Sequence, residues 1–323
     1  MVEKLYVQLT YSREGGDNAH LCVIDIPFLF PVNAMKIIFI HVVCFVLSCC
    51  TLVFGQENEF GSFRSAVALA IAPSGECFVL DGGTNGILRY SRERKLIGHI
   101  GGFGWSDTEF DHPTDIISPD ALNIYVADNG NHRIQRYDRS LNFVSSLFLR
   151  NNEDVDRRFG YPRGVGMSRV GALFIADGEN NRVLKIGTSN NIERVFGGVE
   201  AGAGKLTHPS RIRVSGNDLV YVQDDKRIVI FDIYGNYVRS VGTDTIKGMR
   251  TFTVYNDTLY LLDSCSVRII GPDGRDGGMI PLYAFLSENE CPPADLAVQG
   301  DILFILTTGR VVSHRLMEFE RLK

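Results

Sequence analysis

The residues that could do chemistry recur along this chain instead of gathering in one motif. Aspartates follow short apolar segments at regular intervals, and arginines follow four of them, at Arg133, Arg182, Arg227 and Arg268. A carboxylate at the end of a strand accepts backbone N–H bonds in the following turn, and a guanidinium can pair with it. A catalytic residue is needed once, so we interpret the repeated aspartates as structural. They are Asp81, Asp128, Asp177, Asp224 and Asp263.

Motifs of the common catalytic sites are missing from the sequence. It contains no Gly-x-Ser-x-Gly elbow, no His-Glu-x-x-His zinc motif, no phosphate-binding loop and no Cys-x-x-Cys pair. His112 and His208 occupy equivalent places in two repeats, but no third histidine completes a metal site. We therefore expect no catalytic residue, no metal and no cofactor.

The elements that position these residues form a repeat. Leu122 to Arg133 (Leu-Asn-Ile-Tyr-Val-Ala-Asp-Asn-Gly-Asn-His-Arg) is matched by Ala172 to Arg182, and weaker copies follow at intervals of about 45 residues. Each copy has an upstream half in which Phe or Leu, two residues and Pro precede a short apolar segment, as in Phe110 to Ile116. The unit therefore indicates four antiparallel strands.

The second strand of each unit is continuously apolar, which indicates that it is covered on both faces. Four-stranded sheets that stack face to face around an axis provide that cover, and six units fill residues 56–323. We predict an all-β fold, a six-bladed β-propeller of four-stranded antiparallel blades. An open ring would leave two sheet edges unpaired, so we expect Glu57–Gly61 to supply the outer strand of the last blade.

The Phe-x-x-Pro, Tyr-Val-Ala-Asp and Asn-x-Arg-Ile segments resemble NHL repeats over nearly all of residues 57–323. The resemblance implies a six-bladed propeller that serves mainly as a binding platform. Similar secreted propellers include peptide-amidating lyases and calcium-dependent lactonases or esterases, so a metal-dependent enzyme with its site in the central channel is the alternative. NHL propellers in ubiquitin ligases recognise RNA or protein in the cytoplasm, but no zinc-binding Cys/His array precedes the repeats here.

Chain direction places the start of each inner strand and the turn between the second and third strands on one rim. We expect this rim to be the recognition surface, because loops on a rigid scaffold commonly carry binding residues. Asp115, Arg211 and Asp295 align two residues after the Pro position, and we expect a salt-linked lining there. The candidate binding residues are His112, Asp115, Asn129, Asn131, His132, Arg133, Asn180, Asn181, Arg182, His208 and Arg211.

The N-terminal region determines the expected compartment. Met35-Lys36 precedes an apolar run that ends before Gln56, which is typical of a secretory signal peptide. We therefore expect residues 35–55 to be a signal and the mature protein to be secreted or periplasmic without a membrane span. Residues 1–34 are an extra segment, and our hypothesis is that translation begins at Met35 and leaves this segment untranslated. An uncleaved anchor and an acylated lipoprotein are the alternatives. In an oxidising compartment, Cys265 and Cys291 would be placed to form a disulfide.

Charge and composition limit the partners. The chain has 323 residues, 45% of them hydrophobic, and a formal net charge of −5. This composition supports a large core, and the charges are spread without a basic block, which disfavours nucleic acid. Our leading prediction is an exported, non-catalytic interaction module that presents propeller loops to a protein, peptide or glycan.

Overall fold

A computed structural model of the chain describes residues 58–242, 248–284, 286–290 and 292–316, and two short N-terminal strands, β1 (Gln8–Leu9) and β2 (Cys22–Val23), that pair antiparallel. Residues 1–55 and 56–323 separate into two compact units. The predicted signal peptide and Cys291 lie outside the described residues. The signal and the disulfide therefore remain predictions.

Six four-stranded antiparallel sheets form the blades, and the predicted fold is confirmed. Blade 1 contains β4 (Ala66–Ile71), β5 (Cys77–Asp81), β6 (Gly86–Tyr90) and β7 (Leu96–Gly101); blade 2 contains β8 (Pro113–Ile117), β9 (Asn123–Asp128), β10 (Arg133–Asp138) and β11 (Phe143–Leu147); blade 3 contains β12 (Pro162–Met167), β13 (Leu173–Asp177), β14 (Arg182–Ile186) and β15 (Ile192–Phe196). Blade 4 contains β16 (Pro209–Val214), β17 (Leu219–Asp224), β18 (Arg227–Asp232) and β19 (Tyr237–Val241); blade 5 contains β20 (Thr251–Tyr255), β21 (Thr258–Leu262), β22 (Ser266–Ile270) and β23 (Asp276–Pro281); blade 6 contains β24 (Asp295–Gln299), β25 (Ile302–Leu306), β26 (Val311–Arg315) and β3 (Asn58–Phe60).

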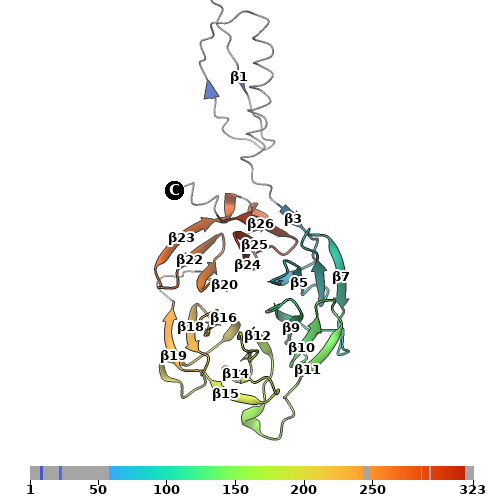
Figure 1. Cartoon of the computed structure of the whole chain (residues 1–323), viewed down its shortest axis with the longest axis vertical. Helices are drawn as coiled ribbons and strands as arrows, with labels where there is room; N and C mark the ends of the chain where they lie inside the picture. The colour runs from blue at the N-terminus through green and yellow to red at the C-terminus, as the bar shows by residue number, and fades with distance from the viewer. Residues whose placement is uncertain are drawn as a thin grey trace, which may run out of the picture. The chain divides into compact units, whose positions relative to one another are not determined.

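The first strand of every blade faces the axis of the ring, and the fourth lies at its periphery (Figure 1). Each inner strand contacts the inner strand of the next blade, and β24 contacts β4. The ring is therefore continuous.

Burial explains why the second strands are apolar throughout. Every residue of β5 and of β13 is buried, whereas the outer strand β7 is mostly exposed. One core cluster combines Phe78 of blade 1 with Val126 and Tyr137 of blade 2, so the core lies between neighbouring blades. Because a single blade would leave both faces exposed to water, the blades stabilise one another.

Blade 6 is completed by β3, the first strand of the propeller region, as predicted. β3 pairs antiparallel with β26, and Phe60 lies opposite Val311. Phe60 is buried, and its ring lies edge-on to Tyr90 of blade 1 at 5.1 Å between centroids. Two distant parts of the chain thus close the ring.

Candidate functional site

The register of the strands defines one rim of the ring. Pro113, at the start of β8, lies opposite Asp128, which ends β9 and also pairs with Arg133 at the start of β10. The same arrangement recurs in blade 3. We use "rim" for the face that carries the turns between second and third strands together with the connections between blades. The connections of the first half are residues 102–112, 148–161 and 197–208.

At the axis, Asp295 of blade 6 pairs with Arg211 of blade 4. The contacts are 2.7 Å from Arg211 Nη1 to Asp295 Oδ1 and 2.8 Å from Nη2 to Oδ2, and both side chains are buried. Asp295 Oδ2 also accepts the backbone N–H of Leu69 in blade 1 at 2.8 Å. Burial raises the pKa of Asp295, although Arg211 and Arg213 act in the opposite direction. One carboxylate therefore ties three blades together at a desolvation cost.

Asp115 of blade 2 makes the equivalent connection to Arg213. Arg213 Nη1 and Nη2 each lie 3.0 Å from one oxygen of Asp115, and Asp115 Oδ2 accepts Val165 N of blade 3 at 3.1 Å. Burial favours the neutral form of Arg213 and so lowers its pKa. The charge and hydrogen bonds of Asp115 outweigh this effect, so the pKa of the guanidinium is raised overall. Sequence alignment of the repeats found Arg211 and missed Arg213. The alternation of side chains along a strand could have found it, since it lies two residues further on.

These axial contacts change the expected role of two candidates. Asp115 and Arg211 were expected to be rim binding residues, but they lie on β8 and β16 with 1% and 8% of their surface exposed. Two ion pairs thus cross the centre of the ring, and both of their arginines come from blade 4.

The repeated aspartates hold the rim turns. Asp81 accepts Arg64 N, Ser65 N and Gly83 N; Asp177 accepts Gly160 N and Glu179 N; Asp263 accepts Cys265 N and Ser266 N. Each carboxylate therefore satisfies backbone donors of its own turn, and those of Asp81 and Asp177 also satisfy donors of the connection that precedes the blade. Loops fixed in this way are positioned before any ligand arrives.

Three arginines extend this anchoring to the connections between blades. Arg133 pairs with Asp128, Arg182 with Asp177 and Arg227 with Asp224. Each also donates to carbonyl oxygens of the preceding connection, as Arg182 does to Asp156 O and Arg158 O at 3.0 and 2.8 Å. The prediction for Arg268 is wrong: this residue pairs with exposed Asp276, and Ser266 Oγ bonds to Asp263 instead. The turn after Asp263 is short, so the partner position falls on Ser266.

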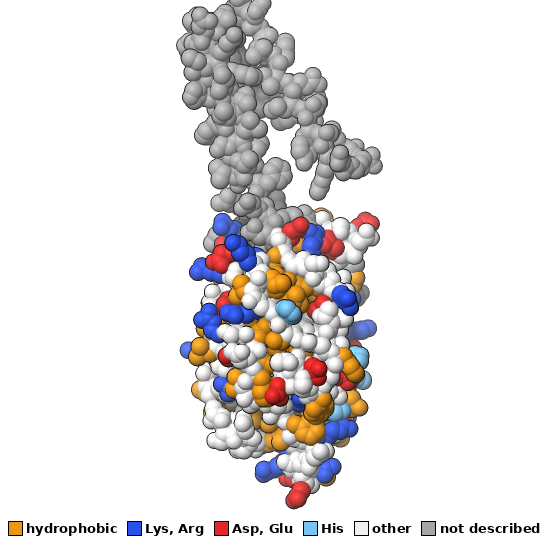
Figure 2. Space-filling view, turned by 90° about the vertical axis from the view of Figure 1, so that its right-hand side faces the viewer, with side chains coloured by type: hydrophobic (Ala, Val, Ile, Leu, Met, Phe, Trp, Pro, Cys, Tyr) orange, Lys and Arg blue, Asp and Glu red, His pale blue; other side chains and the backbone are white. Residues whose placement is uncertain are grey.

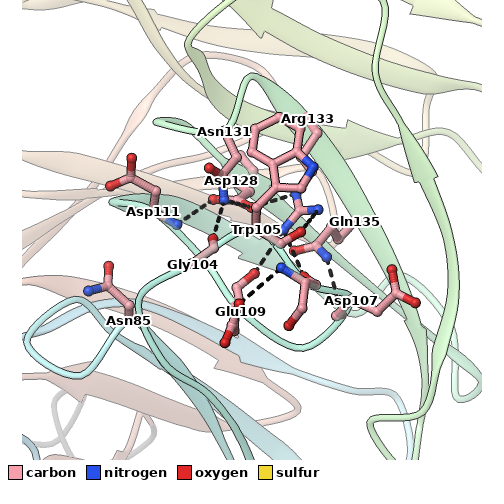
Figure 3. Close-up of polar contacts among 12 residues, drawn as sticks. Asn85, Gly104, Trp105, Asp107, Glu109, Asp111, Asp128, Asn131, Arg133 and Gln135 are labelled. Atoms are coloured by element: carbon pink, nitrogen blue, oxygen red, sulfur yellow. Dashed lines mark hydrogen bonds and ion pairs between the residues drawn. The ribbon is translucent and has the colours of Figure 1, made fainter.

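The connection between blades 1 and 2 is the most strongly anchored. It closes on itself, because Phe110 N donates to Gly102 O at 2.9 Å and the Phe110 side chain is fully buried. Arg133 donates to the carbonyl oxygens of Trp105, Ser106 and Glu109 at 2.9 to 3.0 Å. Figure 3 shows these bonds running from the Arg133 guanidinium to the backbone of the loop. Asn131 adds a bond to Gly104 O at 2.8 Å.

This loop presents aromatic side chains to solvent. Phe103 is 72% exposed and Trp105 is 54% exposed. The Arg133 guanidinium lies 4.9 Å from the Trp105 ring centroid, and Phe148 of the next connection lies edge-on to Trp105 at 5.7 Å. Two neighbours therefore fix the ring while about half of it stays available for contact. Residues 102–110 are the candidate functional site, and we call them the Trp105 loop.

Tyr161, in the connection between blades 2 and 3, is a second exposed aromatic side chain. Tyr161 N donates to His132 Nδ1 at 3.0 Å, and the two rings lie 4.1 Å apart. Arg150 lies 5.4 Å from the Tyr161 ring centroid. Burial and Arg150 lower the pKa of His132, so the neutral ring that accepts this bond is favoured. His132 therefore joins blades 2 and 3.

The remaining candidates lie on the rim, most of them with local contacts. His112 is exposed beside Asp111, and its backbone N–H donates to Asn85 Oδ1 at 3.0 Å. Asn129 donates to Pro162 O, Asn180 to Asp177, and His208 N to Asp224. Asn181 has a positive φ of 52°, which suits the turn. Asn131 and Arg133 are buried supports of the Trp105 loop. No sequence pattern had pointed to Trp105 itself.

Hydrophobic side chains gather on the side of the ring formed by blades 1 and 2 (Figure 2). Leu96 and Ile97 of β7 and Val144 of β11 are among the exposed residues there. Such a patch on a folded protein commonly marks an interaction surface.

Metal-ligand clusters and membrane-spanning helices are both missing from the described residues. No group of three or more His, Cys, Asp or Glu side chains is arranged to hold a metal ion there. None of the helices among them has the length and apolar character needed to cross a bilayer.

Replacement of Asp224 by asparagine should alter the acid unfolding of the protein. Burial favours the neutral acid, but hydrogen bonds from His208 N, Arg227 and Thr207 N outweigh it and lower the pKa of Asp224. A lowered folded-state pKa means that the carboxylate stabilises the fold above the unfolded value of about 3.9 and loses this effect as the pH falls through the folded value.

We therefore expect Asp224→Asn to be less stable at pH 7 and to lose less additional stability than the wild type between about pH 5 and pH 2. Urea unfolding at a series of pH values measures both effects. If the free energies of unfolding of the two proteins changed with pH in parallel, the expected stabilising role of the Asp224 carboxylate would be contradicted.

Comparison with known proteins agrees with this architecture. The model of the NHL repeat matches residues 110–137. Protein brain tumor of Drosophila melanogaster is 27% identical over 157 residues, which cover 47% of this chain but only 14% of that protein. The chain thus matches a small part of the length of this relative.

Solved structures with the same fold include two kinds of enzyme. A streptogramin B lyase is 12% identical with a TM-score of 0.58, covering 80% of this chain and 86% of that one. A gluconolactonase from Xanthomonas campestris is 13% identical with a TM-score of 0.60, covering 79% and 88%. At this identity the likeness concerns the fold alone.

Proposed function

We propose that this six-bladed propeller of the NHL-repeat family is an interaction module that binds a segment of a protein partner through the Trp105 loop and the adjoining rim of blades 2 and 3. The observation that carries the proposal is the anchoring of an exposed tryptophan by buried donors from β10. Tryptophan, tyrosine and arginine dominate the binding energy of protein interfaces.

Rigidity supports the same proposal. A loop that is already ordered loses little conformational entropy when a partner binds. The Trp105 loop is held by Arg133, Asn131 and Gln135, and Tyr161 is held by His132 and Arg150. Both aromatic side chains flank the same turn of blade 2, so one partner segment could contact both.

Photo-crosslinking from two positions tests this function. A benzophenone amino acid replaces Phe103 on the rim in one protein and Val170, in the turn between β12 and β13 on the opposite face, in the other; these residues are 72% and 71% exposed. We expect a discrete protein adduct from position 103 only, and its loss when Trp105→Ala is added. Equal adducts from both faces would contradict the proposal.

Export is part of the proposal, so the extracellular fraction is the sample of choice. The chain recovered there should begin at Gln56 when its N-terminal peptide is sequenced. Recovery of peptides from residues 1–34 in that fraction would refute cleavage at this site.

A further inference from the structure

The Trp105 loop combines an exposed aromatic ring with unbalanced negative charge. Residues 102–110 (Gly-Phe-Gly-Trp-Ser-Asp-Thr-Glu-Phe) contain two acidic residues, Asp107 and Glu109, and no lysine or arginine. Arg133, whose guanidinium bonds to carbonyl oxygens of the loop, is paired with Asp128 of β9. Its charge is therefore already matched, and the loop keeps its negative potential.

Asp107 is the acid best placed to act outside the protein. Its backbone carbonyl accepts bonds from Gln135 Nε2 at 3.2 Å and from Tyr137 Oη at 2.7 Å, so two side chains of β10 fix its backbone. Its exposed carboxylate makes no ion pair among the residues that the structure describes, and in Figure 3 it points away from the hydrogen-bonded cluster. The carboxylate is therefore available to a partner.

Glu109 adds charge without competing for the same contact. Its Oε2 accepts the N–H of Ser106 at 3.0 Å, and this bond is the main cause of the lowered pKa of Glu109. Glu109 is thus ionised at neutral pH while it shapes the loop.

We propose that the Trp105 loop receives a stretch of the partner segment rich in lysine or arginine, with one cation near the exposed part of the Trp105 ring and another near the Asp107 carboxylate. A cation is attracted by the face of an aromatic ring and by a nearby carboxylate, whereas an acidic segment would be repelled by the two acids of the loop. This inference rests on the proposed function, since it states the chemistry of the partner that the rim binds.

The chain contains a single tryptophan, so its fluorescence reports on this loop alone. The probes are tetra-arginine amide, tetra-glutamate and tetraglycine at equal ionic strength. We expect tetra-arginine to change the Trp105 emission in a saturable way and the other two peptides to leave it unchanged. An unchanged emission with tetra-arginine, or an equal response to tetra-glutamate, would overturn the inference.

A matched pair of variants separates the carboxylate from general charge. Asp107→Asn should raise the dissociation constant of tetra-arginine about threefold, the size expected for an exposed ion pair. Asp225→Asn, at an exposed turn of blade 4, is the control and should leave the constant unchanged. Equal effects of the two variants would refute a role for Asp107. Thermal melting of both variants checks that the fold is intact.

The crosslinking experiment distinguishes this inference from the proposed function. If the adduct at position 103 is lost with Trp105→Ala but forms normally with Asp107→Asn, the interaction module stands and the cationic contact is wrong. If no adduct forms from either face, the proposed function fails whatever the peptides show.

Discussion

Replacement of Asp295 by alanine is expected to destabilise the propeller by about 3–5 kcal/mol, the usual cost of leaving one member of a buried ion pair without its partner. Arg211 would then face the axis of the ring uncompensated, and Leu69 N would lose its acceptor. For a domain of this size the loss corresponds to a fall in Tm of about 6–20 °C. Thermal and urea unfolding measure it.

Two further variants make this result interpretable. Asp276→Ala removes the exposed partner of Arg268 and should cost at most about 1 kcal/mol. The double variant Arg211→Met, Asp295→Leu should recover much of the loss, because burial already raises the pKa of Asp295 and no charge remains to be desolvated. If the free energy of unfolding of Asp295→Ala lay within about 1 kcal/mol of the wild-type value, the axial pair would not hold the blades together. If Asp295→Ala fails to fold, Asp295→Asn tests the charge in the same position.

A chain that begins at Ser62 should be much less stable than one that begins at Gln56. The shorter chain lacks β3, so β26 becomes an unpaired edge, and the buried ring of Phe60 is lost from its contact with Tyr90. Removal of a buried phenylalanine side chain alone costs about 3–5 kcal/mol. The exposed edge also favours pairing with other chains.

Differential scanning calorimetry and light scattering measure the two effects of this truncation. The control begins at Gln56 and carries Glu59→Gln, which keeps the strand and removes only an ion pair of Arg310. We expect this control to melt close to the wild type and to scatter light no more strongly than the wild type does. If the Ser62 chain melts at the same temperature as the Gln56 chain, closure by β3 does not stabilise the ring.

The residues that support the Trp105 loop differ in burial from those that the loop exposes. Asp128 and Arg133 are nearly completely buried, yet the loop they support carries some of the most exposed aromatic side chains in the described part of the chain. In the proposed function, stability and recognition are therefore carried by different residues. We expect substitutions at Phe103 or Asp107 to change binding while the support from blade 2 stays intact.

The number of blades, the strands within them, the rim that carries the turns and the closing strand could all be predicted from the amino-acid sequence. The first three depend on hairpins, in which neighbouring segments pair and the apolar pattern sets which faces are buried. The closing strand follows from the need to pair the last sheet edge. The aspartate positions could also be predicted, because Asp128 and its equivalents act on their own turns and on the connection just before their blade. Local interactions leave a periodic signal in one sequence.

The partners across the axis and the conformation of the Trp105 loop could not be predicted from the sequence. Arg211 and Asp295 are 84 residues apart, and Arg213 and Asp115 are 98 apart, so their contact depends on the complete ring. Trp105 lies in a connection without a repeat pattern, and its exposure results from donors on β10 that follow it by nearly 30 residues. The axial pairs need the complete ring because no single repeat contains both partners, and the loop conformation needs one connection to meet the donors of the blade that follows it.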